Sequence, residues 1–205
     1  SMKLKWATVW SILKHMEREK PQKVKRGMFL VAAPQLTDPN FRQSVVLICE
    51  HGSGGSLGLV VNRRTDQHIT EVLPKATGLH EKAGFVYTGG PVQKGSLLIL
   101  HRLGWEVPES RSIFDGVCLG GDLDFLEDAF PRDEGEGLVR VYMGYAGWAP
   151  GQLQFELSSG SWLVLPAQMR MVFARDPLQV WPTILRAQGG AYALYATMPP
   201  DPSLN

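Results

Sequence analysis

The sequence predicts a single compact domain of mixed α/β structure, and three observations lead to this prediction. The chain has 205 residues, a length typical of one domain. Hydrophobic residues make up 44% of it and charged residues 20%, so the chain can bury a sizeable core. Short apolar segments separated by glycine and proline alternate with segments of helical periodicity, and no internal repeat or low-complexity linker marks a second domain.

Residues 3–20 have the pattern of an N-terminal amphipathic helix. Trp6, Trp10 and Leu13 recur on one helical face, and Pro21 ends the pattern because proline lacks an amide donor. An apolar face with two tryptophans must pack on something. We expect it to dock on protein, either on the domain itself or on a second copy in an oligomer, with a membrane surface as the remaining alternative.

The domain that follows is expected to extend over residues 23–196. A glycine-rich turn at 52–55 joins two apolar segments and predicts a hairpin. The prolines of 197–205 predict a flexible tail. The strand candidates are 28–32, 44–49, 57–61, 84–87, 97–101, 113–119, 138–143 and 162–165. The helix candidates are 122–129, 150–157 and 178–187.

The charge balance argues against direct binding of nucleic acid. With 21 basic and 20 acidic side chains the net charge is +1, whereas a protein that neutralises several phosphates usually has a clear basic excess. Every apolar run is shorter than the roughly 20 residues that a transmembrane helix needs. The two cysteines, Cys49 and Cys118, lie in apolar runs, which is typical of reduced thiols in a cytoplasmic protein. We therefore expect a cytoplasmic protein without a transmembrane segment.

The segment Cys49-Glu50-His51 carries the most suggestive chemistry. On a strand, Cys49 and His51 point to the same face, and a neighbouring histidine can activate a thiol as a nucleophile. This is the enzyme hypothesis, in which His51 and Glu50 act as acid and base on a small molecule. The alternative, which we favour, is a buried structural thiol, because the apolar residues 45–48 precede it. Closely spaced Cys or His pairs do not occur, so we expect neither a metal nor a cofactor.

Two glycine-rich segments with aromatic residues, 88–93 and 144–153, predict a binding pocket. Aromatic side chains beside glycines can line a pocket that backbone amides also reach, although glycines equally let a chain pack closely under a tryptophan. Glu50 and His51 flank a buried strand and need polar partners, so we expect them to lie close to one of these segments. The candidate pocket residues are Glu50, His51, Gly89, Gly90, Gln93, Tyr145, Trp148 and Gln152.

Several motifs follow one another in order from about residue 27 to residue 188. They are Gly-Met-Phe-Leu-Val-Ala-Ala-Pro (27–34), Asp-Pro-Asn-Phe (38–41), Ser44 through His51, Gly-Leu-Val-Val-Asn (58–62), Gly-Gly-Pro-Val-Gln (89–93) and Gly-Tyr-Ala-Gly-Trp-x-x-Gly-Gln-Leu-x-x-Glu (144–156). In these motifs the chain resembles the AlgH/YqgE family of bacterial proteins. It departs from many members at 119–122, where Leu-Gly-Gly-Asp replaces a stretch rich in threonine and serine.

The resemblance implies a rolled, barrel-like mixed β-sheet flanked by helices, in a bacterial cytoplasmic protein. Some members are described as transcriptional regulators, but the resemblance supplies no catalytic residues. We therefore expect a non-enzymatic binding or regulatory domain whose partner, a small molecule or a protein, occupies the candidate pocket. The enzyme built on Cys49 is the alternative.

Overall fold

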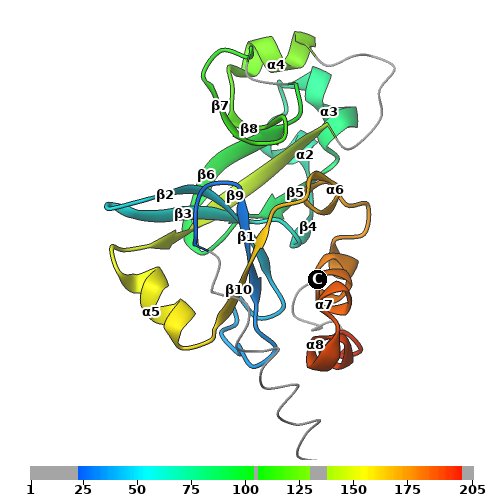
Figure 1. Ribbon diagram of the computed structural model, residues 1–205. Coiled ribbons are helices and arrows are strands. Elements are labelled where there is room, and N and C mark those ends of the chain that lie inside the picture. Colours follow the sequence, from blue (N-terminus) through cyan, green and yellow to red (C-terminus); the bar gives the residue numbers. More distant parts are fainter. Residues whose placement is uncertain (1–22, 104–105, 130–137, 200–205) are drawn as a thin grey trace, which may run out of the picture.

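The computed structural model describes residues 23–103, 106–129 and 138–199 (Figure 1). The predicted helix at 3–20 and residues 200–205 of the predicted tail lie outside these ranges. Within them the chain forms a mixed α/β domain around one strongly curled, half-barrel sheet, so the predicted fold class is confirmed.

The sheet has ten strands, and its main path runs in the order β10-β1-β2-β3-β9-β6-β8-β7. All pairings on this path are antiparallel. Off the path, β4 pairs with β5, and β5 pairs in parallel with β9. The strands are β1 Met28–Ala32, β2 Val45–Gly52, β3 Gly55–Val60, β4 Arg64–His68, β5 Phe85–Thr88, β6 Val92–His101, β7 Ser110–Phe114, β8 Val117–Gly120, β9 Val139–Trp148 and β10 Trp162–Pro166.

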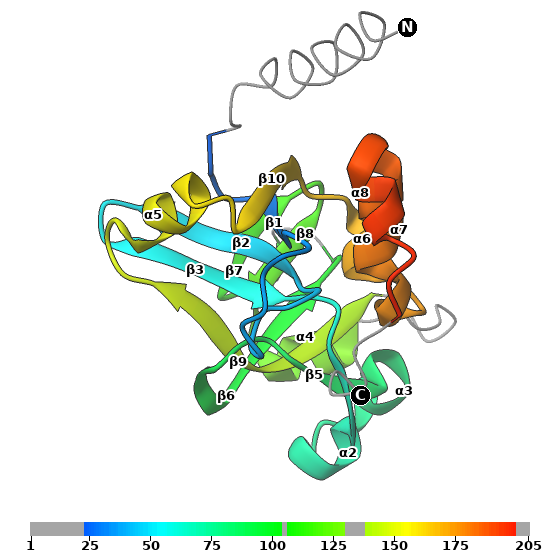
Figure 2. The same ribbon diagram turned by 90° about the horizontal axis from the view of Figure 1, so that it is seen from below.

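The helices lie outside the curled sheet, in groups at its ends and along one side (Figures 1 and 2). Among them, α7 is fixed to β1 because the indole N–H of Trp181 donates to the carbonyl of Ala32 at 2.8 Å. The helices are α2 Ile69–Val72, α3 Thr77–Ala83, α4 Leu123–Ala129, α5 Gln152–Ser158, α6 Met169–Val172, the 3₁₀ turn Pro177–Gln179, α7 Val180–Gln188 and α8 Gly190–Tyr195.

Two apolar clusters fill the described part of the molecule. The larger one lies among β1, β2, β3, β10 and α7, with Phe29, Leu47 and Trp181 among its members. The smaller one packs α2, α3 and α4 on the beginning of β9, through residues such as Leu79 and Val141. Burying large apolar side chains contributes about 1.5–3 kcal/mol each, so these clusters hold the helices on the sheet.

Most predicted elements are present, and the main exceptions have local causes. The segment 113–119, predicted as one strand, is a hairpin of β7 and β8, because Asp115 and Gly116 adopt φ of 41° and 78° and turn the chain. Pro182 lies in the first turn of α7, where a missing amide donor does little harm. The strand β4 was not predicted, since its sequence Arg-Thr-Asp-Gln-His is polar throughout.

Candidate functional site

Cys49 is buried in β2, as predicted from its apolar neighbours. The register between β2 and β3 shifts between Ile48 and Glu50, which leaves Cys49 as the extra residue of a β-bulge. Its side chain has no exposed surface, and its thiol approaches the carbonyl of Leu47 at 3.6 Å. Burial and, to a smaller extent, the charge of Glu50 raise the pKa of Cys49, and Arg111 lowers it, with a net value of about 12. A thiol in this state is protonated near neutral pH and is a poor nucleophile.

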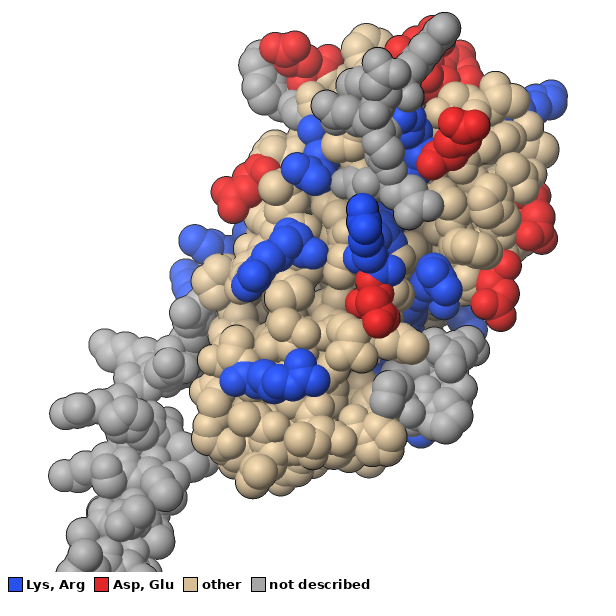
Figure 3. Space-filling view, turned by 90° about the vertical axis from the view of Figure 1, so that its right-hand side faces the viewer, with Lys and Arg blue, Asp and Glu red and all other residues tan. Residues whose placement is uncertain are grey.

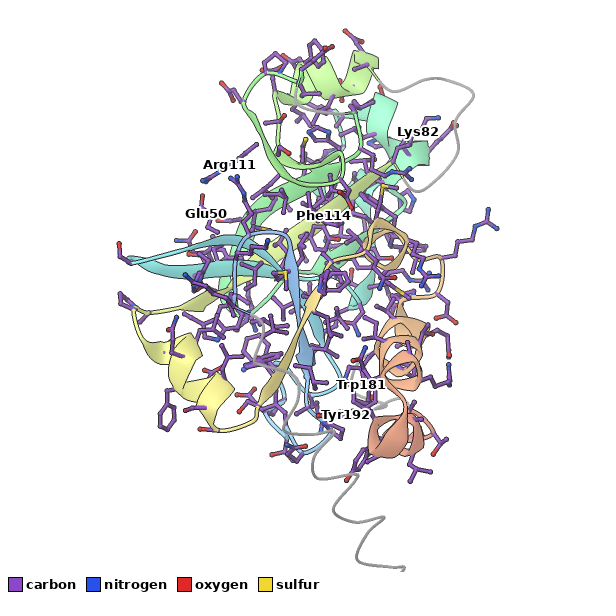
Figure 4. All side chains as sticks on the ribbon, in the orientation of Figure 1. Glu50, Lys82, Arg111, Phe114, Trp181 and Tyr192 are labelled. Carbon is purple, nitrogen blue, oxygen red and sulfur yellow. The ribbon has the colours of Figure 1, made fainter. Side chains whose placement is uncertain are left out.

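Glu50 and His51 contact different parts of the fold. The carboxylate of Glu50 forms an ion pair with Arg111 of β7, which Figure 4 shows on the left of the molecule. Nδ1 of His51 lies 2.7 Å from the hydroxyl oxygen of Ser56 in β3. Ser56 in turn pairs with Trp148, so His51 is two strands away from the second glycine-rich segment. The contacts of Glu50 lead to β7 instead, and a pocket shared by both side chains stays a prediction.

Gly89 and Gly90 are required by a close approach of two chain segments. A Cβ atom on Gly90 would lie 2.2 Å from the carbonyl carbon of Tyr145, and one on Gly89 would lie 2.3 Å from the carbonyl oxygen of Gly144. The connection between β5 and β6 therefore passes directly over the backbone of β9. These glycines have a structural role that explains their presence without a ligand.

Trp148 and Gln152 belong to one hydrogen-bonded network centred on Glu156 of α5. The indole N–H groups of Trp148 and Trp162 both donate to Oε2 of Glu156, at 3.0 and 2.8 Å. The amide of Gln152 donates to Oε1 of the same carboxylate at 3.1 Å. Phe41 packs on both indole rings, with centroid distances of 6.0 and 5.5 Å. The network fixes α5 against the sheet and leaves few polar atoms for a ligand.

Of the two remaining candidates, Gln93 lies at the bulged start of β6 and Tyr145 lies on β9 beside it. Gln93 is exposed, has φ of 46° and accepts a hydrogen bond from the hydroxyl of Ser96 at 3.3 Å. Tyr145 is half-buried and pairs across the sheet with Val92. The structure thus brings Trp148 and Gln152 together and packs Gly90 against the backbone of Tyr145, whereas Glu50 and His51 lie on β2 and Gln93 lies on β6.

A hollow of about 110 Å³ lies elsewhere, between the ends of β4, α3 and β5, the start of β9 and the segment after α6. Its described lining contains four cationic side chains, three aromatic rings and no carboxylate, and we call it the basic hollow. Figure 3 looks at this side of the molecule, where several Lys and Arg side chains gather around an acidic one. The lining residues are Arg64, Lys82, Ala83, Gly84, Phe85, Tyr87, Val139, Arg140, Phe173 and Arg175.

The cations of the basic hollow are held against aromatic rings and a backbone carbonyl. The guanidinium of Arg140 lies 4.4 Å from the ring centroid of Tyr87 and donates to the carbonyl of Ala174 at 2.7 Å. The guanidinium of Arg64 lies 4.9 Å from the ring centroid of Phe85. Burial lowers the pKa of Arg140; Tyr142 raises it and the charge of Arg64 lowers it again. The two arginines are thus close enough to repel each other.

Sequence reasoning missed the basic hollow completely. Its four cations come from positions 64, 82, 140 and 175, which form no cluster in the sequence. The chain as a whole carries a net charge of only +1, so composition gave no sign of a local basic site. The pairs Arg64/Phe85 and Arg140/Tyr87 arise from the pairing of β4 and β9 with β5, which only the folded structure shows.

The comparisons with known proteins agree with this architecture. The AlgH-like family model matches residues 29–193. A UPF0301 protein of Streptomyces avermitilis is 38% identical over 187 residues, covering 87% of this chain and 94% of that protein. A UPF0301 protein of Chlorobium limicola is 33% identical, and the match covers 89% of this chain and 97% of that protein.

Two solved structures have the same fold. The crystal structure of protein DIP2367 from Corynebacterium diphtheriae superposes with a TM-score of 0.75 at 27% identity, covering 89% of this chain and 96% of that one. The solution structure of the AlgH protein from Pseudomonas aeruginosa gives a TM-score of 0.64 at 30% identity, covering 89% and 97%.

By its fold, this chain is a single-domain α/β protein with a curled, mainly antiparallel sheet. The chain belongs to the AlgH-like family, so the resemblance found in the sequence is confirmed. These relatives are bacterial. Their names give no reaction, so membership assigns none. No helix within the described residues is long and apolar enough to cross a membrane.

Proposed function

We propose that this protein is a non-enzymatic binding domain with a regulatory role, and that its ligand is a small molecule held in the basic hollow. The observation that carries the proposal is a concave site lined by arginines and aromatic rings. Such groups orient a ligand by charge and stacking. Arginine stays protonated at neutral pH, so it is a poor proton donor or acceptor for catalysis.

The candidate residues predicted from the sequence also favour a non-enzymatic role. Trp148, Gln152 and the glycines Gly89 and Gly90 each have a structural partner within the fold. Cys49, on which the enzyme hypothesis rests, is buried with a raised pKa. A binding role for Glu50, His51, Gln93 and Tyr145 remains part of the prediction, at a location separate from the basic hollow.

A cytoplasmic location is part of the proposal. Both cysteines, Cys49 and Cys118, are buried free thiols, which suits a reducing compartment. The ligand would then be a soluble metabolite of the cell interior, and its concentration would set the fraction of protein in the bound state.

The test is a screen of mixed soluble metabolites against the purified full chain, followed by thermal denaturation and by one-dimensional NMR of the mixture. We expect at least one compound to raise the melting temperature while its NMR signals keep constant total intensity over hours. A ligand present at about 100 times its Kd would stabilise the protein by about 2.7 kcal/mol. Steady conversion of a compound by the protein would contradict the proposal and favour an enzyme.

A further inference from the structure

We propose that the basic hollow recognises a phosphate group on a small metabolite; this inference rests on the proposed binding function and names the class of ligand. Three arginines converge at this site: Arg64, Arg140 and Arg175 line one hollow, and its described lining holds no carboxylate. Figure 4 shows Lys82 on the side of the molecule opposite Glu50 and Arg111, so this site is separate from that ion pair.

Two of these arginines, Arg140 and Arg64, contact neutral groups of the fold. Arg140 contacts the ring of Tyr87 and the carbonyl of Ala174, and Arg64 contacts the ring of Phe85. All of these described partners are electrically neutral. Two guanidinium groups close enough to influence each other are stabilised when an anion lies between them, and a guanidinium binds phosphate oxygens through paired N–H donors.

Charge and size favour a phosphate group over other anions at this site. A phosphate monoester carries a charge of about −1.5 to −2 at neutral pH and three strong acceptor oxygens, so it can engage several cations at once. A carboxylate carries one charge and has two oxygens. The hollow measures about 110 Å³, below the roughly 300–1,000 Å³ typical of pockets for drug-sized ligands. It therefore suits a phosphate group with a small body.

The exposed aromatic ring of the lining can hold the body of the ligand. Phe85 is exposed in part, with 39% of its surface accessible, although aromatic side chains are usually more buried. Phe173 also lines the hollow, but it is a buried core residue with the guanidinium of Arg102 5.7 Å from its ring centroid. A flat or apolar group beside the phosphate would cover Phe85, so the inferred ligand is a phosphate ester with a small ring or short carbon chain.

The experiment measures binding of phenyl phosphate, inorganic phosphate and benzoate to the full chain at constant ionic strength, by calorimetry and by ¹⁵N chemical shifts. We expect phenyl phosphate to bind roughly tenfold more tightly than benzoate, with inorganic phosphate in between. The shifted amides should map to residues 83–87, 139–140 and 173–175. Equal binding of benzoate, or shifts confined to other residues, would overturn the assignment.

Variants separate the site from general surface charge. Arg64 and Arg175 are both exposed, so Arg64→Gln and Arg175→Gln should leave the fold intact, and the double variant should bind phenyl phosphate roughly tenfold more weakly. Arg140→Lys keeps the charge but loses the paired donors and should also weaken binding. Arg186→Gln is the matched control, because Arg186 is an exposed arginine of α7 outside the lining, and it should bind as the unmodified protein does.

The outcomes distinguish this inference from the proposed function. Loss of binding in Arg186→Gln equal to that in the double variant would show adsorption to surface charge and would overturn the phosphate site. A neutral metabolite that stabilises the protein and shifts the same amides, with phenyl phosphate inert, would overturn the phosphate assignment and leave the binding function intact. Turnover of a metabolite would contradict the binding function itself.

Discussion

The environment of Cys49 decides whether its thiol is a structural group or a nucleophile. The four apolar residues before it, 45–48, predict burial, and the structure confirms it. The sequence placed His51 on the same face as a possible activating base, but His51 bonds to Ser56 instead. Glu50 finds its partner in Arg111, 61 positions further along the chain. No local pattern predicts a contact of that separation.

We expect thiol reagents to modify Cys49 slowly in the native protein. Its thiol is fully buried and its pKa is raised to about 12, so the thiolate is scarce and out of reach. Mass spectrometry after incubation at pH 7.5 would follow the reaction, with urea-unfolded protein as the fast reference. Rapid labelling that is abolished by Cys49→Ser would contradict the buried thiol and support the enzyme hypothesis.

Replacement of Glu156 by glutamine should destabilise the protein. The carboxylate accepts two indole N–H groups on one oxygen, and the neutral amide is a weaker acceptor. We expect the free energy of unfolding to fall by about 1–3 kcal/mol in urea denaturation. Glu81→Gln, at an exposed position of α3, is the control and should change it by less than about 0.5 kcal/mol. Equal effects of both variants would show that the network around Glu156 does not contribute to stability.

At the scale of elements, the glycines of the candidate pocket prove to be packing positions. Gly90 lets the chain before β6 lie on β9, which is one of the two roles that its sequence context allows, the other being ligand binding. The elements that the sequence did predict are those with strong apolar patterns. The polar strand β4 and the short helices α2, α3, α6 and α8 were missed, because tertiary contacts rather than local periodicity define them.

The substitution Gly90→Ala should lower the free energy of unfolding by about 3 kcal/mol or more, or prevent folding. Its Cβ would meet the backbone of Tyr145 and Ala146 at 2.2–2.3 Å, where neither chain can give way. Gly54→Ala is the matched control, since a Cβ there would meet nothing within 4 Å. Thermal denaturation of both variants compares them directly, and a stable Gly90→Ala protein would refute the close approach.

The N-terminal segment 3–20 remains a sequence prediction, as it lies outside the described residues. If its Trp6/Trp10 face packs on protein, each buried side chain contributes about 1.5–3 kcal/mol. Removing residues 1–20 should then lower the melting temperature or change the oligomeric mass measured by light scattering. Unchanged values, with loss of the protein from a membrane fraction, would favour the membrane alternative instead.

The whole molecule should lose stability as the pH falls below about 6.5, and His101 is one cause. Its side chain is completely buried, and burial lowers its pKa, an effect that the backbone of Gly120 partly opposes. The unfolded chain therefore binds a proton at a pH where the native state does not. This contribution to stability is full above the unfolded pKa and is lost as the pH falls towards the folded pKa.

The measurement is an NMR titration of the imidazole signals, combined with urea denaturation between pH 7.5 and 5.0. We expect the His101 ring to stay neutral at a pH at which exposed histidines are already charged. In His101→Gln the decline of stability with falling pH should be less steep. A His101 signal that titrates at or above 6.5 would contradict the effect of burial.

Taken over the whole chain, the sequence predicted the fold class and the family, but it did not predict the location of the basic hollow. Fold class follows from patterns that repeat over many residues, such as the apolar runs of β1 and β2. The hollow depends on strands brought together by pairing, so its four cations have no common signature in the sequence. The polar pocket expected around Glu50 and His51 remains to be tested by ligand binding.

The strand β9 has a consequence for how the molecule opens. It supplies Val139 and Val141 to the smaller apolar cluster and Ala146 and Trp148 to the larger one, so the two clusters share a single strand. The smaller cluster, with fewer buried contacts, should open first and expose its amides to hydrogen exchange. The basic hollow takes Ala83 and Val139 from the smaller cluster, and Tyr87 and Phe173 from the larger one. A molecule bound there would join the two clusters into one cooperative unit, and amides of α2, α3 and α4 would then exchange as slowly as those of β2.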